Sequence, residues 1–315
     1  MDILIGILEQ GLIYSIMALG IYITYKVLNF PDLTVDGSFP LGAAITASLM
    51  TNTDSALISS ITLGHNPYII CIYALISGGI AGLITGIIHV KFKVRDLISG
   101  IITMTGLYSI NLRIAGSANV PIFNMDTIFS NNFVYNLFPK ALLKYNVLII
   151  GFAITFGIKL ILDIYLRTKS GYLLRAVGTN SVLVTTLAKD SGNVKILGIV
   201  IANSLVALGG SIMMQQQGFF EITMGTGAMV LGLASVIIGT NLFKKINFVK
   251  ATTAVIFGSM IYKASMSVAM DISFTKASDM RLVTSILFLI ILIAGQVKNK
   301  KVKIFVRVKE YLQDI

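Results

Sequence analysis

The stretch that decides the fold is "NFPDLTVDGSFPLGAA", residues 29–44, which lies between two apolar runs of the chain. Two carboxylates, two prolines and two glycines stand there, where a membrane-spanning helix should begin or end. Non-helical backbone persists at membrane depth only if it is buried in protein or lines a water-filled cavity. We therefore expect this segment to lie inside the protein and not against lipid.

Composition identifies the class of protein around this stretch. The chain has 315 residues, of which 55% are hydrophobic and 12% charged, and its mean hydropathy is +0.85. Its apolar runs are continuous and reach the roughly 20 residues that cross a bilayer core as a helix, whereas a membrane β-barrel would show short alternating strands. These features predict an all-α fold, a single polytopic membrane bundle over residues 1–315.

About nine spans are predicted, and the basic residues between them set the orientation. Lys and Arg cluster at 91–95, 167–195, 244–250 and 298–309, and such clusters mark the cytoplasmic side. The N-terminus is then outside and the C-terminus cytoplasmic, with no removable signal peptide. The net charge of +11 reflects this topology, so we expect no nucleic-acid partner.

The predicted spans are 10–28, 37–63, 68–90, 97–115, 146–166, 195–214, 226–243, 251–270 and 281–297. The second of them is interrupted by "TNTDS". It is either a broken helix or a span followed by a separate interfacial piece.

Two pairs of similar segments indicate an internal repeat. "SIMALG" at 15–20 matches "SLVALG" at 204–209, and "FPDLTV" at 30–35 matches "FFEITM" at 219–224. The copies lie in the first and the sixth predicted spans, an odd number of places apart in the order of spans, so they would cross the bilayer in opposite directions. Inverted repeats with interrupted helices recur in transporters; the alternative is a chance match of small and apolar residues. The two halves are approximately residues 9–115 and 195–297.

The interrupted segments supply candidate residues for a translocation path. An ionisable group inside a membrane costs ~2.5–3.5 kcal/mol on insertion scales and is a functional candidate for that reason. The alternative for Asp32 and Asp36 is that they cap helix N-termini. Lys263 would either pair with an acidic group or line a wet cavity, whereas we expect Lys159 to extend to the membrane interface. The path candidates are Asp32, Thr34, Asp36, Gly37, Glu221, Thr223, Gly227 and Lys263.

The sequence predicts no catalytic site and no metal site. It lacks H-E-x-x-H, G-x-S-x-G and Cys/His arrangements. His65 and His89 stand apart without further ligands, and Cys71 is the single cysteine. The phosphate-binding pattern G-x-x-x-x-G-K-[ST] is also missing, so a process driven by ATP would need another chain to bind the nucleotide.

The inner loop reads "RTKSGYLLRAVGTNSVLVTTLAKDSGNV" at 167–194. It is compatible with two short helices that carry apolar side chains and a basic edge, and Asn180 with Ser181 would cap the second helix. Such a pair suits a groove in a cytoplasmic partner. The alternative is an interfacial helix that lies on anionic lipid.

These motifs resemble those of the permease subunits of bacterial ABC importers, in the branched-chain amino acid and ribose permease superfamily. "TKSGYLLRAVGTN" is similar to the family's cytoplasmic coupling motif and "FPDLTVDGSFPLGAA" to its early membrane motif, and the resemblance covers roughly residues 9–297. The longer "LNFPDLTVDGSFPLGAA" resembles a narrower branch linked to uptake of tryptophan, tyrosine or related substrates. The coupling residues that the resemblance implies are Gly171, Leu174, Arg175, Ala176, Gly178 and Asn180.

The resemblance also implies an assembly in the bacterial cytoplasmic (inner) membrane. Two permease copies, identical or closely related, would form the path, and two ABC ATPase subunits would dock beneath them on the coupling helices. An extracytoplasmic substrate-binding protein would deliver the substrate. ATP and Mg would be bound by the ATPase, while this chain would hold no cofactor and catalyse no reaction. An extra N-terminal span of the ribose-type members is missing, which fits the branched-chain type.

The mechanism that follows is alternating access, in which the two halves rock around the path between them. The main alternative is an ion-coupled secondary transporter, in which Asp32, Glu221 or Lys263 would bind the ion or proton. Such a carrier would transport without ATP and without a second chain. An intramembrane enzyme would need a nucleophile or metal constellation that the sequence lacks, and the repeat disfavours a mere scaffold.

Overall fold

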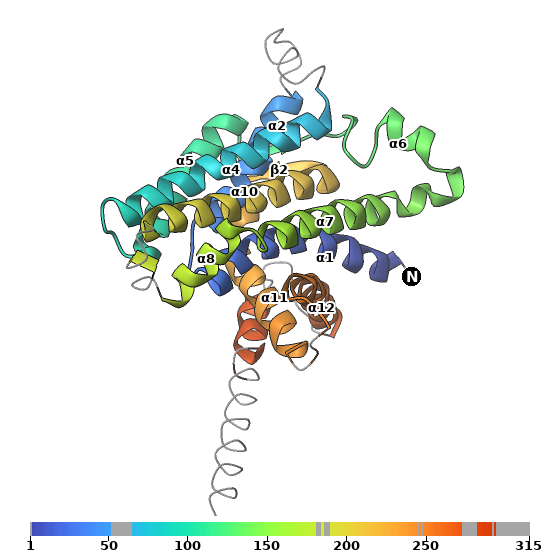
Figure 1. Cartoon of the computed structure of the whole chain (residues 1–315). Coiled ribbons are helices and arrows are strands. Elements are labelled where there is room, and N and C mark those ends of the chain that lie inside the picture. The colour runs from blue at the N-terminus through green and yellow to red at the C-terminus, as the bar shows by residue number, and fades with distance from the viewer. Residues whose placement is uncertain are drawn as a thin grey trace, which may run out of the picture.

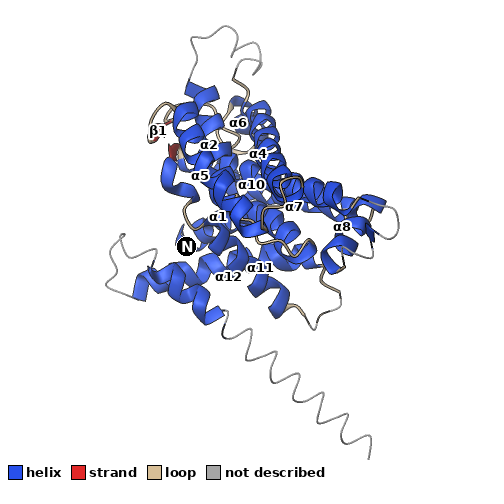
Figure 2. Cartoon of the chain, turned by 90° about the vertical axis from the view of Figure 1, so that its left-hand side faces the viewer, coloured by secondary structure: helices blue, strands red, loops and turns tan. Residues whose placement is uncertain are grey.

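The computed structural model describes residues 2–51, 65–180, 184–185, 190–244, 246, 248–272, 282–291 and 293. This part of the chain is helical apart from one two-stranded sheet (Figures 1 and 2). Its elements are α1 (Asp2–Ile21), the π-helix η1 (Tyr22–Val27), α2 (Val35–Thr51), α4 (Pro67–Val90), α5 (Asp96–Ala115), β1 (Asn119–Pro121), α6 (Asn132–Leu137), the 3-10 helix η2 (Lys140–Tyr145), α7 (Asn146–Tyr165), α8 (Lys169–Thr179), α10 (Ser191–Gln217), β2 (Phe219–Glu221), the 3-10 helix η3 (Ile222–Gly225), α11 (Ala228–Leu242) and α12 (Ala251–Ile272).

Six helical segments of the described chain are long and apolar enough to cross a membrane. They coincide with six of the nine predicted spans, and they confirm an all-helical protein with several membrane spans. The predicted second span begins as α2, which has 17 residues, and its remainder lies outside the described residues. The six segments are Ile3–Val27, Pro67–Val90, Asp96–Ala115, Leu142–Tyr165, Ser191–Gln217 and Ile222–Leu242.

Two helices, α1 and α10, form the centre of the bundle. α10 packs against α4, α2 and α1, and α1 also packs against α12, α7 and α11 (Figure 1). Apolar side chains from both helices make up much of the largest buried cluster. A helix that is apolar on all sides is expected at such a buried position.

The two ends of the bundle carry different connections. The N-terminus and α6 lie at one end, and α8 lies at the opposite end (Figure 1). At the first end β1 pairs antiparallel with β2, so that Asn119 faces Glu221 and Pro121 faces Phe219. This ribbon ties the long loop after α5 to the chain that follows α10.

Two stretches interrupt the helices near the centre. The first break, residues 28–34, follows η1 and contains Asn29 in the left-handed region with φ of 54°. The second break, residues 218–227, starts and ends with glycines of positive φ, Gly218 at 79° and Gly227 at 81°. The helix interruptions that "FPDLTV" and "FFEITM" predict are therefore present in both places.

Candidate functional site

Asp36 lies in the first turn of α2, directly after the first break, and it contacts the end of the second break. Its carboxylate accepts hydrogen bonds from the backbone N–H groups of Gly227, at 3.1 Å, and Met229, at 2.7 Å. Gly227 is the N-cap residue of α11 and offers no side chain for this purpose. Because the first N–H groups of a helix need acceptors and favour negative charge, Asp36 caps α11 from across the molecule.

Asp32 orders the chain that leads into α2. Its Oδ1 accepts the N–H of Thr34 at 2.9 Å, and its Oδ2 accepts a hydrogen bond from Nδ2 of Asn203 at 2.7 Å. Oδ1 of Asn203 accepts in turn from the Ser38 hydroxyl at 2.7 Å. Asp32 is 2% exposed, so these bonds replace the water that the carboxylate has lost and fix the start of α2 on the middle of α10.

A chain of buried hydroxyls holds the first break from the other side. Thr34 Oγ1 lies 2.7 Å from Thr85 Oγ1 in α4, and Thr85 donates to Thr103 Oγ1 in α5 at 2.9 Å. All three side chains are buried. The start of α2 is thus connected by polar contacts to α4, α5, α10 and α11.

A cavity of about 280 Å³ opens where α2, α5 and the second break come together. Asn111 of α5 lines it and donates through Nδ2 to the Gly37 carbonyl at 3.0 Å. Two of the predicted path residues, Asp36 and Gly37, therefore share this cavity with the second break. Its lining consists of Asp36, Gly37, Pro40, Met104, Thr105, Tyr108, Asn111, Ile222 and Thr226.

The structure places the other path candidates at separate positions. Glu221 lies at the exposed end of β2 and accepts a hydrogen bond from the hydroxyl of Thr223. Lys263 lies in α12, where its Nζ is 4.0 Å from the ring centroid of Tyr14 and donates to Gln10 Oε1 at 3.4 Å. Lys263 also borders a cavity of about 220 Å³, and this cavity is distinct from the one that Asp36 lines.

The expectation that Lys159 extends to the membrane interface is wrong. Its side chain is buried and forms an ion pair with Asp163, one turn later in α7, at 3.1 Å. Asp163 also pairs with Lys250 at 3.0 Å and accepts from the Thr252 hydroxyl at 2.6 Å. The buried carboxylate keeps Lys159 inside, and it joins α7 to the start of α12.

The inner loop forms α8, which packs against α10 and η1. Gly171, Leu174 and Val177 are on its buried side, whereas Tyr172 and Arg175 are exposed. The predicted coupling residues are thus divided between the two faces. Ala176 is half-buried, and the second predicted helix of the loop lies largely outside the described residues.

Gly178 and Asn180, the remaining coupling candidates, lie at the C-terminal end of α8. A Cβ on Gly178 would collide with the carbonyl oxygen of Val27, the last residue of η1. Asn180 is the C-cap residue of α8. The close approach at Gly178 brings α8 directly against the residue that precedes the first break.

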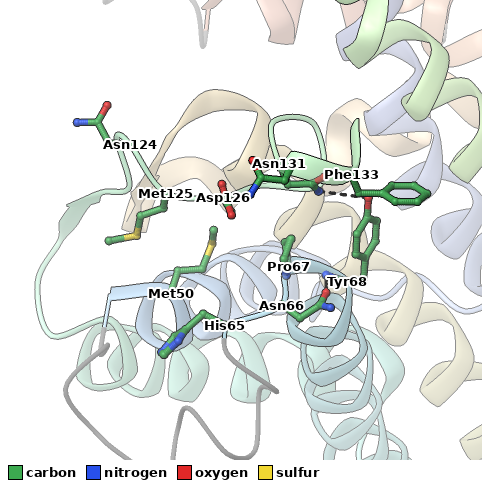
Figure 3. A pocket seen from close by; sticks show the side chains of 11 residues that line it. Met50, His65, Asn66, Pro67, Tyr68, Asn124, Met125, Asp126, Asn131 and Phe133 are labelled. Carbon is green, nitrogen blue, oxygen red and sulfur yellow. Dashed lines mark hydrogen bonds between the residues drawn. The ribbon is translucent and has the colours of Figure 1, made fainter. Parts of the chain in front are cut away.

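A second and larger cavity, of about 590 Å³, lies at the end of the bundle where α2 ends and α4 begins (Figure 3). Met50 and Tyr68 line it from the helices, and Asp126 and Asn131 line it from the loop after β1. Asn131 donates to the Tyr68 hydroxyl at 3.3 Å, the bond drawn in Figure 3. The loop is thereby held over the first turn of α4.

The family model described as "Branched-chain amino acid transport system / permease component" matches residues 3–294. The chain belongs to this family. It is 42% identical to a "Tyrosine transport system permease protein" of Clostridioides difficile, over 93% of this chain and 91% of that protein. It is also 34% identical to an uncharacterized protein of Rickettsia prowazekii, over 86% and 90% of the two chains. No solved structure matches significantly.

Family membership confirms the resemblance that the motifs at 29–44 and 168–180 indicated, and it makes the chain a multi-pass membrane permease of an amino acid transport family. Sequence reasoning missed Asn111 and Asn203, which hold the site together, and Asp163, which keeps Lys159 inside. Each is a polar or charged residue inside an apolar span, which is the signal that could have identified it.

Proposed function

We propose that this chain is the membrane-spanning permease subunit of an ABC importer, and that its substrate is an amino acid of aromatic or branched-chain type. Family membership and the tyrosine permease relative support the class of substrate. The observation that carries the mechanism is the contact of Asp36 with Gly227 and Met229. It joins two helices that both begin in the interior, which is the arrangement in which transporters form a path.

The two helices belong to halves of opposite orientation in this proposal. α2 ends beside the loop residues 124–133, whereas α11 ends beside Tyr22 and Lys26 of η1. They therefore run from a shared starting point toward opposite ends of the bundle. Together with the matching segments "FPDLTV" and "FFEITM", this supports an inverted repeat, in which α2, α12 and the segment at 281–297 complete about nine spans.

The path lies on the exposed side of α5, where a second permease copy would face it. α5 and α7 are the two least buried of the six spans, yet α5 is the least hydrophobic of the six and α7 the most. The exposed side chains of α7 are all apolar, as a lipid-facing helix requires. The exposed face of α5 includes Thr105, Gly106, Tyr108 and Ser109, so it suits a polar corridor between two copies.

Coupling to an ATPase would pass through α8. Tyr172, 59% exposed, and Arg175 form an outer face for docking. On the inner face Gly178 lies against the Val27 carbonyl, and Leu174 and Leu28 both approach Gly198 of α10. A displacement of α8 would therefore act on η1 and the first break without an intermediate element. ATP and Mg would be bound by the ATPase, and an extracytoplasmic binding protein would deliver the amino acid at the end with the 590 Å³ cavity.

Reconstitution tests the proposal. The chain, its ATPase subunit and its substrate-binding protein are placed in proteoliposomes, and uptake of L-tyrosine and L-leucine is measured with and without ATP. We expect uptake only from the complete assembly with ATP. Uphill uptake by the purified chain alone, driven by an ion gradient, would refute the proposal in favour of an ion-coupled carrier.

One pair of variants tests the docking face. Arg175→Glu reverses the charge on the exposed side of α8, and Arg167→Glu makes the same change just before the helix begins. We expect Arg175→Glu to abolish substrate-stimulated ATP hydrolysis while the protein still inserts into the membrane, and Arg167→Glu to retain most of it. Equal ATP hydrolysis by both variants would exclude Arg175 from coupling.

A further inference from the structure

We propose that the 280 Å³ cavity between α2, α5 and the second break binds the ammonium group of the transported amino acid, through Asn111 and Asp36. This inference rests on the proposed function and adds a binding site to it. The cavity is slightly smaller than the ~300–1,000 Å³ typical of ligand pockets, so it suits a single small solute.

Asn111 provides the first indication of a ligand. It is fully buried and lines the cavity, and its Oδ1 has no hydrogen-bond partner. The orientation of the amide is fixed, because the Gly37 carbonyl can only accept and therefore faces Nδ2. The group left without a partner is an acceptor, and a buried acceptor without a donor costs about 1–3 kcal/mol. A ligand that donates would remove this cost.

Charge gives the second indication. Helix N-termini attract anions, but the N-terminus of α11 already binds the carboxylate of Asp36. The hydroxyls of Thr105, Tyr108 and Thr226 belong to exposed residues. The polar groups that remain on the buried side of the cavity are acceptors, namely Asn111 Oδ1 and the unused lone pairs of Asp36. They match a cationic donor with several N–H groups, which is the chemistry of an ammonium group.

The rest of the cavity suits the remainder of an amino acid. Pro40, Met104 and Ile222 provide apolar walls, and the exposed ring of Tyr108 lies at the side of the corridor. Such a mixture of apolar walls and a few polar groups is typical of sites for small molecules. The cavity is lined by residues of α2 and of the second break, so a ligand there would contact both and would respond to a change in their separation.

Cysteine protection tests the site in the complete transporter. In a Cys71→Ser background, Thr105→Cys places a thiol on the cavity wall, whereas Ala153→Cys places one on the exposed, apolar face of α7. The complex with its ATPase is placed in vesicles of phosphatidylcholine and phosphatidylglycerol, which carry no primary amine. A charged, membrane-impermeant thiosulfonate is added, because it reacts with thiolates, which form in water and not in lipid.

The probes separate the ammonium group from the rest of the molecule. L-Tyrosine, L-leucine and tyramine carry the amine, and 3-(4-hydroxyphenyl)propionate lacks it. At a concentration of about ten times Kd, mass action leaves about one site in eleven free, so the amines should slow labelling of Thr105→Cys about tenfold. Ala153→Cys should stay unreactive throughout. Absence of protection by the amines, or equal protection by the propionate, would overturn the inference.

Variants of Asn111 separate binding from a structural role. Asn111→Leu removes the acceptor and should abolish protection, whereas Asn111→Asp keeps an acceptor and should retain it. Thr240→Val, which removes a hydroxyl that bonds only carbonyls of its own helix and lies outside the cavity, should leave protection unchanged. Loss of protection in both Asn111 variants would assign the residue only to holding Gly37 and would overturn the inference.

The uptake assay distinguishes the two proposals. ATP-dependent uptake by the assembly without protection of Thr105→Cys would end the inference and leave the importer intact. Absence of ATP-dependent uptake, with ion-driven uptake by the chain alone, would end the importer proposal itself.

Discussion

Single carboxylates have an unusually large structural role in this chain. Asp32 and Asp36 are four residues apart, yet Asp32 ties the chain before α2 to α10, whereas Asp36 caps α11. Hydrogen bonds to a charged group contribute about 1.5–3 kcal/mol each, so these contacts can offset the cost of burying the charges. The same side chain can therefore both line the translocation path and cap a helix.

The bond between Asn203 and Asp32 should contribute strongly to stability. Asn203→Leu leaves the Asp32 Oδ2 and the Ser38 hydroxyl without a partner in the interior. We expect a loss of about 2–3 kcal/mol of unfolding free energy, measured as a lower melting temperature of the purified protein. Thr240→Val is the control, because that hydroxyl bonds only backbone carbonyls of its own helix. An equal loss of unfolding free energy in both variants would show that the contact of Asn203 with Asp32 contributes no more than an ordinary hydroxyl.

At the scale of helices and strands, the sequence predicted where the two breaks lie, but it did not predict which residues they contact. Prolines, glycines and acidic residues within apolar sequence indicated where the helices stop. Asp36, which caps α11, stands 191 positions earlier than Gly227, and no local pattern reveals such a contact. The sequence interpretation placed Lys159 at the membrane interface because it considered only how close the residue is to the end of its span. It overlooked Asp163, which follows four residues later, at the spacing of a helical ion pair.

The contact of α8 with η1 gives a prediction for this element. Gly178→Ala would drive a methyl group into the Val27 carbonyl, whereas a Cβ at Gly157 of α7 meets no atom within 4 Å. We expect Gly178→Ala to lower ATP-driven uptake at least tenfold in the reconstituted assembly, and Gly157→Ala to leave it near the wild-type level. Wild-type uptake by Gly178→Ala would mean that α8 does not act through η1.

The molecule as a whole is organised around α1 and α10, with the long loop at one end and α8 at the other (Figure 1). Hydropathy and basic clusters predicted the membrane class and most of the spans, because both follow from the cost of burying charge in lipid. The central position of α10 was not predictable in the same way. Its many small residues fit either a lipid-facing or a buried helix, and only tertiary packing decides between them.

Orientation in the membrane can be tested on intact cells. In a Cys71→Ser background, Ser117→Cys in the loop after α5 should react with a membrane-impermeant maleimide from outside. Arg167→Cys, just before α8, should react only after the cells are permeabilised. Both positions are exposed in the chain, so a reversed pattern would show that the predicted orientation is wrong.

The ribbon of β1 and β2 has a mechanical consequence for the molecule. Extended backbone is nearly inextensible along its length, and β2 leads within a few residues to the start of α11. A displacement of the loop that carries β1 would therefore pass through β2 and η3 to the start of α11. A partner that grips only the outer rim could thereby shift the deepest part of the protein.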